Sequence, residues 1–214
     1  MNETRDYSID LVLRFNAEDV LADDQEPSRF LNEYGGDLAL TNEDYEVTEI
    51  IGSFHAIVIN VSGAVAEEEY LFDIFDSEGT TLEYYDLYNF KRGYFKKTVT
   101  SAACELSIWN PNLLILDGLF VEPRHRGHGV GLLALKALIH RLGAGVGLVA
   151  MKPFPLECGS VHQYDPVAHA KATAKLRKYY SRLNFVRVQG MELMVRSPGL
   201  PLPKATLIVG DDGS

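Results

Sequence analysis

The sequence predicts an α/β protein, in which helices flank a twisted, mixed β-sheet. Apolar segments of strand length alternate with helix-like segments along the second half of the chain, which is the order typical of this class. The 214 residues are 46% hydrophobic and 23% charged, a composition typical of folded proteins rather than disordered ones. The two cysteines form no C-x-x-C motif, so we expect neither a disulfide framework nor a four-thiolate zinc site.

The first half of the chain predicts strands at two places. Residues 7–15 alternate in polarity, which predicts an opening strand. The segment 47–65 is rich in Ile and Val and predicts one or two central strands. Between them, residues 17–46 are acidic and contain a Gly-Gly pair, so we expect a short helix and loops. Residues 67–88 carry apolar and aromatic side chains at roughly helical spacing.

The middle of the chain predicts a strand, a turn and a helix in succession. Residues 113–121 form an apolar run that reads as a buried strand, and a glycine-rich turn follows over 124–131. Leucine and isoleucine then recur at helical spacing over 130–142, and Gly143 supplies a stop signal.

The end of the chain predicts the remaining elements of the sheet. Residues 146–151 form another buried strand, and Asp165-Pro166 supplies an N-cap and a first-turn proline for a helix. This helix ends near Leu183, where Asn184 tolerates the left-handed conformation. A hairpin over 185–195 closes the sheet.

These elements predict a single domain over residues 1–196. It has an N-terminal part, 1–100, and a core, 101–196, and we expect residues 197–214 to form a flexible tail.

Charge is divided unevenly along the chain. The net charge is −10, but residues 1–100 carry −15 and residues 101–214 carry +5. The acidic excess argues against general nucleic-acid binding and favours a cationic partner.

The sequence predicts a cytoplasmic protein without a membrane anchor. The uncharged run 50–66 contains polar residues and glycines, so we do not expect it to span a bilayer. The chain also shows no signal-peptide pattern. A homodimer is left open.

The turn at 126–131 predicts an anion site. A strand that leads through glycines into a helix directs backbone N–H groups and the positive end of the helix dipole toward one spot, and Arg126 adds a donor. The chain has no Gly-Lys-Ser or Gly-Lys-Thr of a nucleotide-binding P-loop. The dinucleotide fingerprint also fails, because Leu132 stands where its last glycine should be.

Two segments resemble one known family. The run Val121-x-Pro123-x-x-Arg126-Gly127-His128-Gly129-Val130-Gly131 resembles the acetyl-CoA-binding turn of the GNAT superfamily of N-acetyltransferases. The run Tyr179-Tyr180-Ser181-Arg182-Leu183-Asn184-Phe185 is similar to a downstream segment of that family, with Asn184 in place of glycine. The resemblance covers roughly residues 113–195 and implies a GNAT-like sheet with a cleft between splayed strands.

The resemblance also implies roles for individual residues. The strand edge at Leu119, Phe120 and Val121 would pair with the pantetheine amides of acetyl-CoA, and the turn would hold the pyrophosphate. Tyr180 would act as general acid for the departing thiolate. The expected cofactor-binding residues are Leu119, Phe120, Val121, Arg126, Gly127, His128, Gly129, Val130 and Gly131.

The catalytic base is less well defined by the sequence. Many relatives place a glutamate near the start of the strand before the turn, where this chain has Ile115. Asp117 on the same strand is the candidate we assign, Glu105 upstream is an alternative, and no base is needed if the amine binds partly deprotonated. We expect no metal, because a glycine turn does not hold His125 and His128 on one helical face.

The predicted function is acetyl-CoA-dependent transfer of an acetyl group to a primary amine by direct attack on the thioester. The acceptor would be a small molecule or a protein side chain, and the acidic first half favours a cationic one. The alternative is a module of the same fold that binds CoA without turnover and acts as a sensor or in protein interaction.

Overall fold

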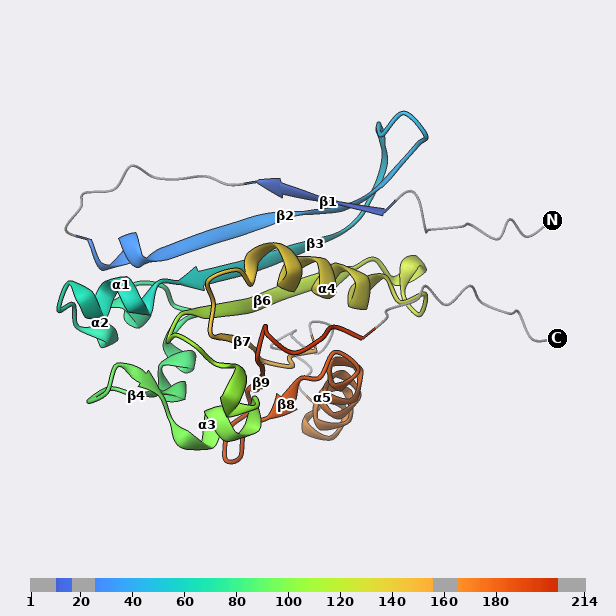
Figure 1. The fold of residues 1–214 in the computed structure, drawn as a ribbon. Coiled ribbons are helices and arrows are strands. Elements are labelled where there is room, and N and C mark those ends of the chain that lie inside the picture. Colours follow the sequence, from blue (N-terminus) through green and yellow to red (C-terminus); the bar gives the residue numbers. More distant parts are fainter. Residues whose placement is uncertain (1–10, 17–25, 156–164, 204–214) are drawn as a thin grey trace, which may run out of the picture.

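The structure is a computed structural model that describes residues 11–16, 26–155 and 165–203 (Figure 1). Seven strands form one mixed sheet in the order β1-β2-β3-β6-β7-β9-β8, and β4 and β5 form a separate ribbon. The sheet strands are β1 (Leu11–Asn16), β2 (Leu31–Thr41), β3 (Val47–Ile59), β6 (Leu113–Val121), β7 (Leu148–Met151), β8 (Val186–Arg187) and β9 (Met194–Arg196), and the ribbon consists of β4 (Tyr88–Asn89) and β5 (Tyr94–Phe95).

Helices cover both faces of this sheet, which confirms the predicted fold class. The α-helices are α1 (Val61–Ala66), α2 (Leu71–Asp76), α3 (Lys97–Ala102), α4 (Val130–Leu142) and α5 (Pro166–Ser181). Short 3-10 helices occur at η1 (Pro27–Phe30), η2 (Leu82–Leu87), η3 (Glu105–Ser107) and η4 (Pro123–His125). No helix in the described ranges is both long enough and apolar enough to cross a bilayer.

Successive side chains of the central strands pack alternately into two separate cores. Leu113 and Ile115 of β6 belong to a core that includes residues of α1, α2, α3 and η2. Leu114 and Leu116 face the opposite side and pack with α4. This alternation follows from the two-residue repeat of a strand, so β6 is buried on both faces over this stretch.

Strands β6 and β7 separate part-way along their length. They pair in parallel from Leu113 and Leu148 to Ile115 and Ala150, whereas β6 continues to Val121 paired only with β3 among the described strands. On the β7 side, the edge of β6 beyond Ile115 therefore has no neighbouring strand in the part of the chain that the structure describes. This divergence produces the predicted cleft between splayed strands.

The expectation of a helix and loops over 17–46 is wrong for residues 31–41, which form β2. The Gly35-Gly36 pair lies within this strand, between β1 and β3. A Cβ atom on Gly36 would lie 1.9 Å from the Arg14 carbonyl oxygen and 2.8 Å from the Phe54 ring. Glycine therefore permits a close approach of neighbouring groups here, and does not mark a turn.

The strand predicted over 47–65 ends at Ile59, and α1 follows. The Asn60 side chain accepts a hydrogen bond from the Gly63 backbone N–H, which caps this short helix. Helical structure over 67–88 is confirmed as α2 and η2. Of the opening strand, the described part is β1, and residues 7–10 lie outside the described ranges.

The predictions for the second half agree closely with the structure. Helix α4 has the predicted bounds, and α5 begins where Asp165 accepts hydrogen bonds from the backbone N–H groups of Val167 and Ala168. Asn184 adopts φ 63°, in the left-handed region. The closing hairpin is confirmed by the antiparallel pairing of β8 with β9.

The segment after β9 begins inside the protein. Ser197 is fully buried, and its hydroxyl donates to the Ser107 carbonyl oxygen at 3.0 Å. The Arg196 guanidinium donates to the Leu200 carbonyl oxygen at 2.6 Å. Residues 204–214 of the predicted tail lie outside the described ranges.

Candidate functional site

Two adjoining cavities open where β6 leaves β7. The turn cavity, of about 490 Å³, lies between the outer half of β6, the turn at 126–131 and α5. The bulge cavity, of about 230 Å³, lies beside Asp117 and extends to η2 and the end of β7. Leu119, Phe154 and Tyr180 line both cavities, so together they form one site with two compartments.

The turn cavity collects most of the residues that the sequence assigns to cofactor binding. Eight of the nine line it: Leu119, Phe120, Val121, Arg126, Gly127, Gly129, Val130 and Gly131. The ninth, His128, is half-buried and lies outside the lining. Helix α5 supplies the opposite wall through Ala172, Lys175, Leu176 and the two tyrosines.

Two glycines give the turn its shape. Gly127 has φ 86° and Gly129, the N-cap of α4, has φ 85°. Residues with a Cβ atom are strained at such positive φ values. The turn can lead into α4 with this backbone conformation because glycines occupy both positions. The first amides of α4 lie at the positive end of its dipole, which borders the turn cavity.

Gly131 has a second reason to be glycine. A Cβ atom there would lie 2.8 Å from the Tyr179 hydroxyl of α5. The missing side chain therefore lets α5 approach the first turn of α4, which brings the two walls of the turn cavity together.

Arg126 lies at the mouth of the turn cavity. Its Nε donates to the Val121 carbonyl oxygen at 2.7 Å, and its guanidinium lies 5.6 Å from the centre of the Phe120 ring. Because these contacts fix the side chain at one end, its cationic group is held beside the turn.

The two cavities differ in charge. Arg126 and Lys175 line the turn cavity, and the described residues contribute no carboxylate to its lining. The bulge cavity is lined by Glu83 and Asp117 as well as by Lys152. An anionic group therefore suits the turn cavity, while the bulge cavity offers carboxylates to a cation.

Tyr180 lies where the two cavities meet. It is half-buried on α5, and its ring centre lies 5.7 Å from that of Tyr179. Burial, with a smaller contribution from Tyr179, raises the pKa of Tyr180 to about 12. The phenol therefore keeps its proton at neutral pH and can donate it.

Asp117 owes its position to a β-bulge. Gly118 pairs with His55, and Leu116 pairs with Ala56, so Asp117 is the additional residue on β6. A bulge redirects the side chain of its extra residue, and such features recur beside active sites. The Asp117 carboxylate lines the bulge cavity and lies 3.0 Å from Nδ1 of His55.

Sequence reasoning missed His55 and Glu33. Nε2 of His55 lies 3.4 Å from the Glu33 carboxylate on β2, so the imidazole bridges carboxylates from two other strands. The sequence signal was a single histidine within an Ile- and Val-rich strand, which reveals neither the register nor the bulge that creates the cluster.

The far wall of the bulge cavity contains an ion pair. Lys152, which follows β7, donates to the Glu83 carboxylate of η2 at 2.5 Å. Tyr84 is buried beside it, and burial, followed by the charges of Glu83 and Asp117, raises the pKa of its phenol.

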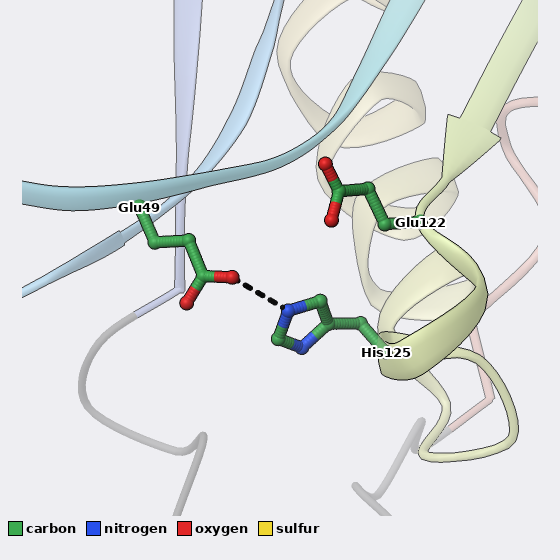
Figure 2. A group of neighbouring side chains, drawn as sticks. All are labelled: Glu49, Glu122 and His125. Carbon is green, nitrogen blue, oxygen red and sulfur yellow. Dashed lines mark hydrogen bonds and ion pairs between the residues drawn. The ribbon is translucent and has the colours of Figure 1, made fainter.

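A separate cluster connects the turn to the start of β3. Figure 2 shows Glu49 reaching from β3 toward His125, while Glu122 extends from the end of β6. The Nε2 atom of buried His125 lies 3.0 Å from Glu49. These three residues could together offer ligand atoms to a metal, but Arg124 already pairs with Glu49 at 2.6 Å and with Glu122 at 2.9 Å. The cluster therefore has its own compensating cation and anchors the turn.

Other candidate residues are placed less fully. Glu105, the alternative base, begins η3, and its side chain is outside the described part of the structure.

Comparisons of the chain with protein-family models, with curated proteins and with solved structures found no match. The assignment of a function therefore depends on the geometry of the two cavities.

Proposed function

We propose that this protein is an acetyl-CoA-dependent N-acetyltransferase of the GNAT type. The observation that carries the proposal is the junction at Tyr180, a protonated phenol between an anion-attracting cavity at a glycine turn and a carboxylate-containing cavity. The two compartments suit a phosphorylated acyl donor and an amine acceptor, respectively.

The turn cavity suits an anionic donor in charge and has the volume of a small-molecule site. Its volume of about 490 Å³ lies in the usual range for small-molecule sites. The backbone at Gly127 and Gly129 presents no Cβ atom to an approaching pyrophosphate, and Arg126 and Lys175 supply cations. On its β7 side, the edge of β6 at Leu119, Phe120 and Val121 has no described strand beside it, so an extended pantetheine chain could bind along it.

Two residues of this chain, Tyr180 and Asp117, would serve the reaction. When bound, acetyl-CoA supplies the acyl group as a thioester. Asp117 would take one proton from the bound ammonium before it attacks, and Tyr180 would donate its proton to the departing sulfur. The second proton, which the nitrogen loses after the attack, would restore the phenol of Tyr180. Both residues line the bulge cavity, so an amine held there would share that compartment with the base and the acid.

The bulge cavity favours a cationic acceptor, in agreement with the acidic first half of the chain. Glu83 and Asp117 both line it, although Lys152 offsets part of their charge. The acceptor would be a small amine or a lysine side chain. A cytoplasmic location remains a prediction of the sequence.

Calorimetric titration with CoA and acetyl-CoA tests the donor site. Lys175 and Lys178 are exposed on the same helix, but only Lys175 lines the turn cavity. Lys175→Glu should weaken binding by about 10-fold or more, while the matched control Lys178→Glu should change it little. Equal affinities in the native protein and Lys175→Glu would contradict the proposed site.

An acceptor screen follows with acetyl-CoA and a panel of polyamines, aminoglycoside-like amines and lysine peptides. Release of free CoA that depends on the amine would support the enzyme. Tight CoA binding without turnover for any amine would instead support the alternative, a CoA-binding module of the same fold.

A further inference from the structure

His55 occupies an unusual position behind the proposed base. It is half-exposed and lies between Asp117 of β6 and Glu33 of β2, at 3.0 Å and 3.4 Å respectively. Asp117 lines the bulge cavity, whereas His55 and Glu33 do not. The imidazole therefore connects Asp117, in the cavity, to the Glu33 carboxylate, whose side chain is 45% exposed to solvent.

The chemistry of the proposed reaction calls for such a connection. A primary amine binds mostly as ammonium at neutral pH, and it must lose a proton before its lone pair can attack. A carboxylate alone accepts that proton poorly, because carboxyl groups are much stronger acids than ammonium groups. An imidazole hydrogen-bonded to the carboxylate is a better final acceptor at physiological pH.

We propose that His55 relays the acceptor's proton from Asp117 to solvent beside Glu33. This inference rests on the proposed function and identifies how its base is regenerated. The relay begins from the tautomer of His55 that carries its proton on Nε2, so that Nδ1 can accept from Asp117. The ammonium N–H bond breaks as Asp117 accepts the proton, and the proton then passes from the carboxyl oxygen to Nδ1. The resulting imidazolium lies between two carboxylates, and its Nε2 proton leaves to water. The proton left on Nδ1 then exchanges to Nε2 through water, which restores the starting tautomer for the next turnover.

The electrostatics of the cluster set the pH at which the relay operates. The hydrogen bond to Asp117 is the largest influence and raises the pKa of His55; burial opposes it, and Glu33 raises it further. Asp117 and Glu33 are the charged groups that face the ring from the adjacent strands β6 and β2. Only the neutral imidazole can accept a proton, so the rate should rise with pH as His55 loses its charge.

The test is the pH profile of kcat/KM for acetyl transfer to an amine that the native protein accepts, measured between pH 5.5 and 9. His55→Gln should remove the limb that rises with pH through the His55 titration and lower the rate at pH 7.5 by about 10-fold or more. Glu33→Gln removes a carboxylate that favours the imidazolium, so the rise of kcat/KM with pH should occur at lower pH in this variant. His140→Gln, on the exposed end of α4, is the matched control and should leave the profile unchanged.

Two further measurements separate the outcomes. The C2 proton of His55, followed by NMR, should titrate above pH 6.5 in the native protein and at lower pH in Glu33→Gln, and this assay needs no activity. Calorimetry should show native CoA affinity in His55→Gln. A turnover profile that keeps its limb in His55→Gln would overturn the relay alone, whereas absence of turnover in the native protein with every amine would overturn the proposed function and the relay together.

Discussion

Tyr180 combines burial with a position at the junction of the two cavities. A phenol is useful as an acid only while it is protonated, and a pKa of about 12 keeps it so throughout the physiological range.

Replacing this residue separates chemistry from binding. Tyr180→Phe retains the ring and its packing but loses the proton, so kcat should fall by about 100-fold or more while CoA affinity stays near the native value. Steady-state kinetics and calorimetry measure the two effects. Because the native phenol ionises only near pH 12, the native rate should show no alkaline loss from Tyr180 up to about pH 10.5. An unchanged kcat in Tyr180→Phe would exclude Tyr180 as the acid.

At the scale of elements, the outer half of β6 both completes the sheet and lines the site. It pairs with β3 on one edge and leaves the other edge to the cavities, while its bulge turns Asp117 toward His55. The geometry of the site therefore depends on how β1, β2 and β3 support this strand.

The Gly35-Gly36 pair in β2 offers a matched test of that support. Gly36→Ala would place a Cβ atom 1.9 Å from the Arg14 carbonyl oxygen, whereas a Cβ atom on Gly35 would meet nothing within 4 Å. Gly36→Ala should lower the free energy of unfolding by about 1–3 kcal/mol and loosen β1, while Gly35→Ala should stay within about 0.5 kcal/mol of native. Urea denaturation gives the energies, and hydrogen exchange of the β1 amides reports the local opening. Equal effects of the two substitutions would mean that β1 and β2 do not pack this closely.

At the scale of the whole molecule, the core on the α1–α3 side buries tyrosines together with aliphatic side chains. Tyr84 and Tyr88 are almost fully buried in the core on the α1–α3 side, and the Tyr88 hydroxyl donates to the Pro111 carbonyl oxygen at 2.7 Å. Burial raises the pKa of both phenols above the usual value of 10.

This arrangement predicts a loss of stability at alkaline pH. Above pH 10 the unfolded chain releases phenolic protons that the folded protein retains. The contribution of these tyrosines to the free energy of unfolding is therefore fully present below pH 10 and is lost as the pH rises from 10 through the folded-state pKa values. Each such tyrosine should cost about 1 kcal/mol between pH 10 and 11. Urea denaturation at a series of pH values measures the slope, which should be shallower in Tyr88→Phe. A parallel slope in that variant would show that Tyr88 does not stay protonated in the fold.

The sequence by itself determined those features that depend on neighbouring residues. Periodic leucines and a following glycine specify α4, Asp165-Pro166 specifies the start of α5, and the glycines at 127 and 129 specify the turn. These are local signals, because a helix and its caps are built from contacts only a few residues apart.

Only the tertiary structure decided the arrangement that gives the site its chemistry. The pairing of β3 with β6, and the bulge within it, bring Asp117 to His55 across 62 positions of sequence, and Glu33 joins them from a strand that the Gly-Gly pair concealed. Strand register depends on contacts between distant segments, and a shift of one residue would turn each of these side chains to the opposite face. The residues of the turn can therefore be found in the sequence, whereas the partners of the base appear only once the sheet is assembled.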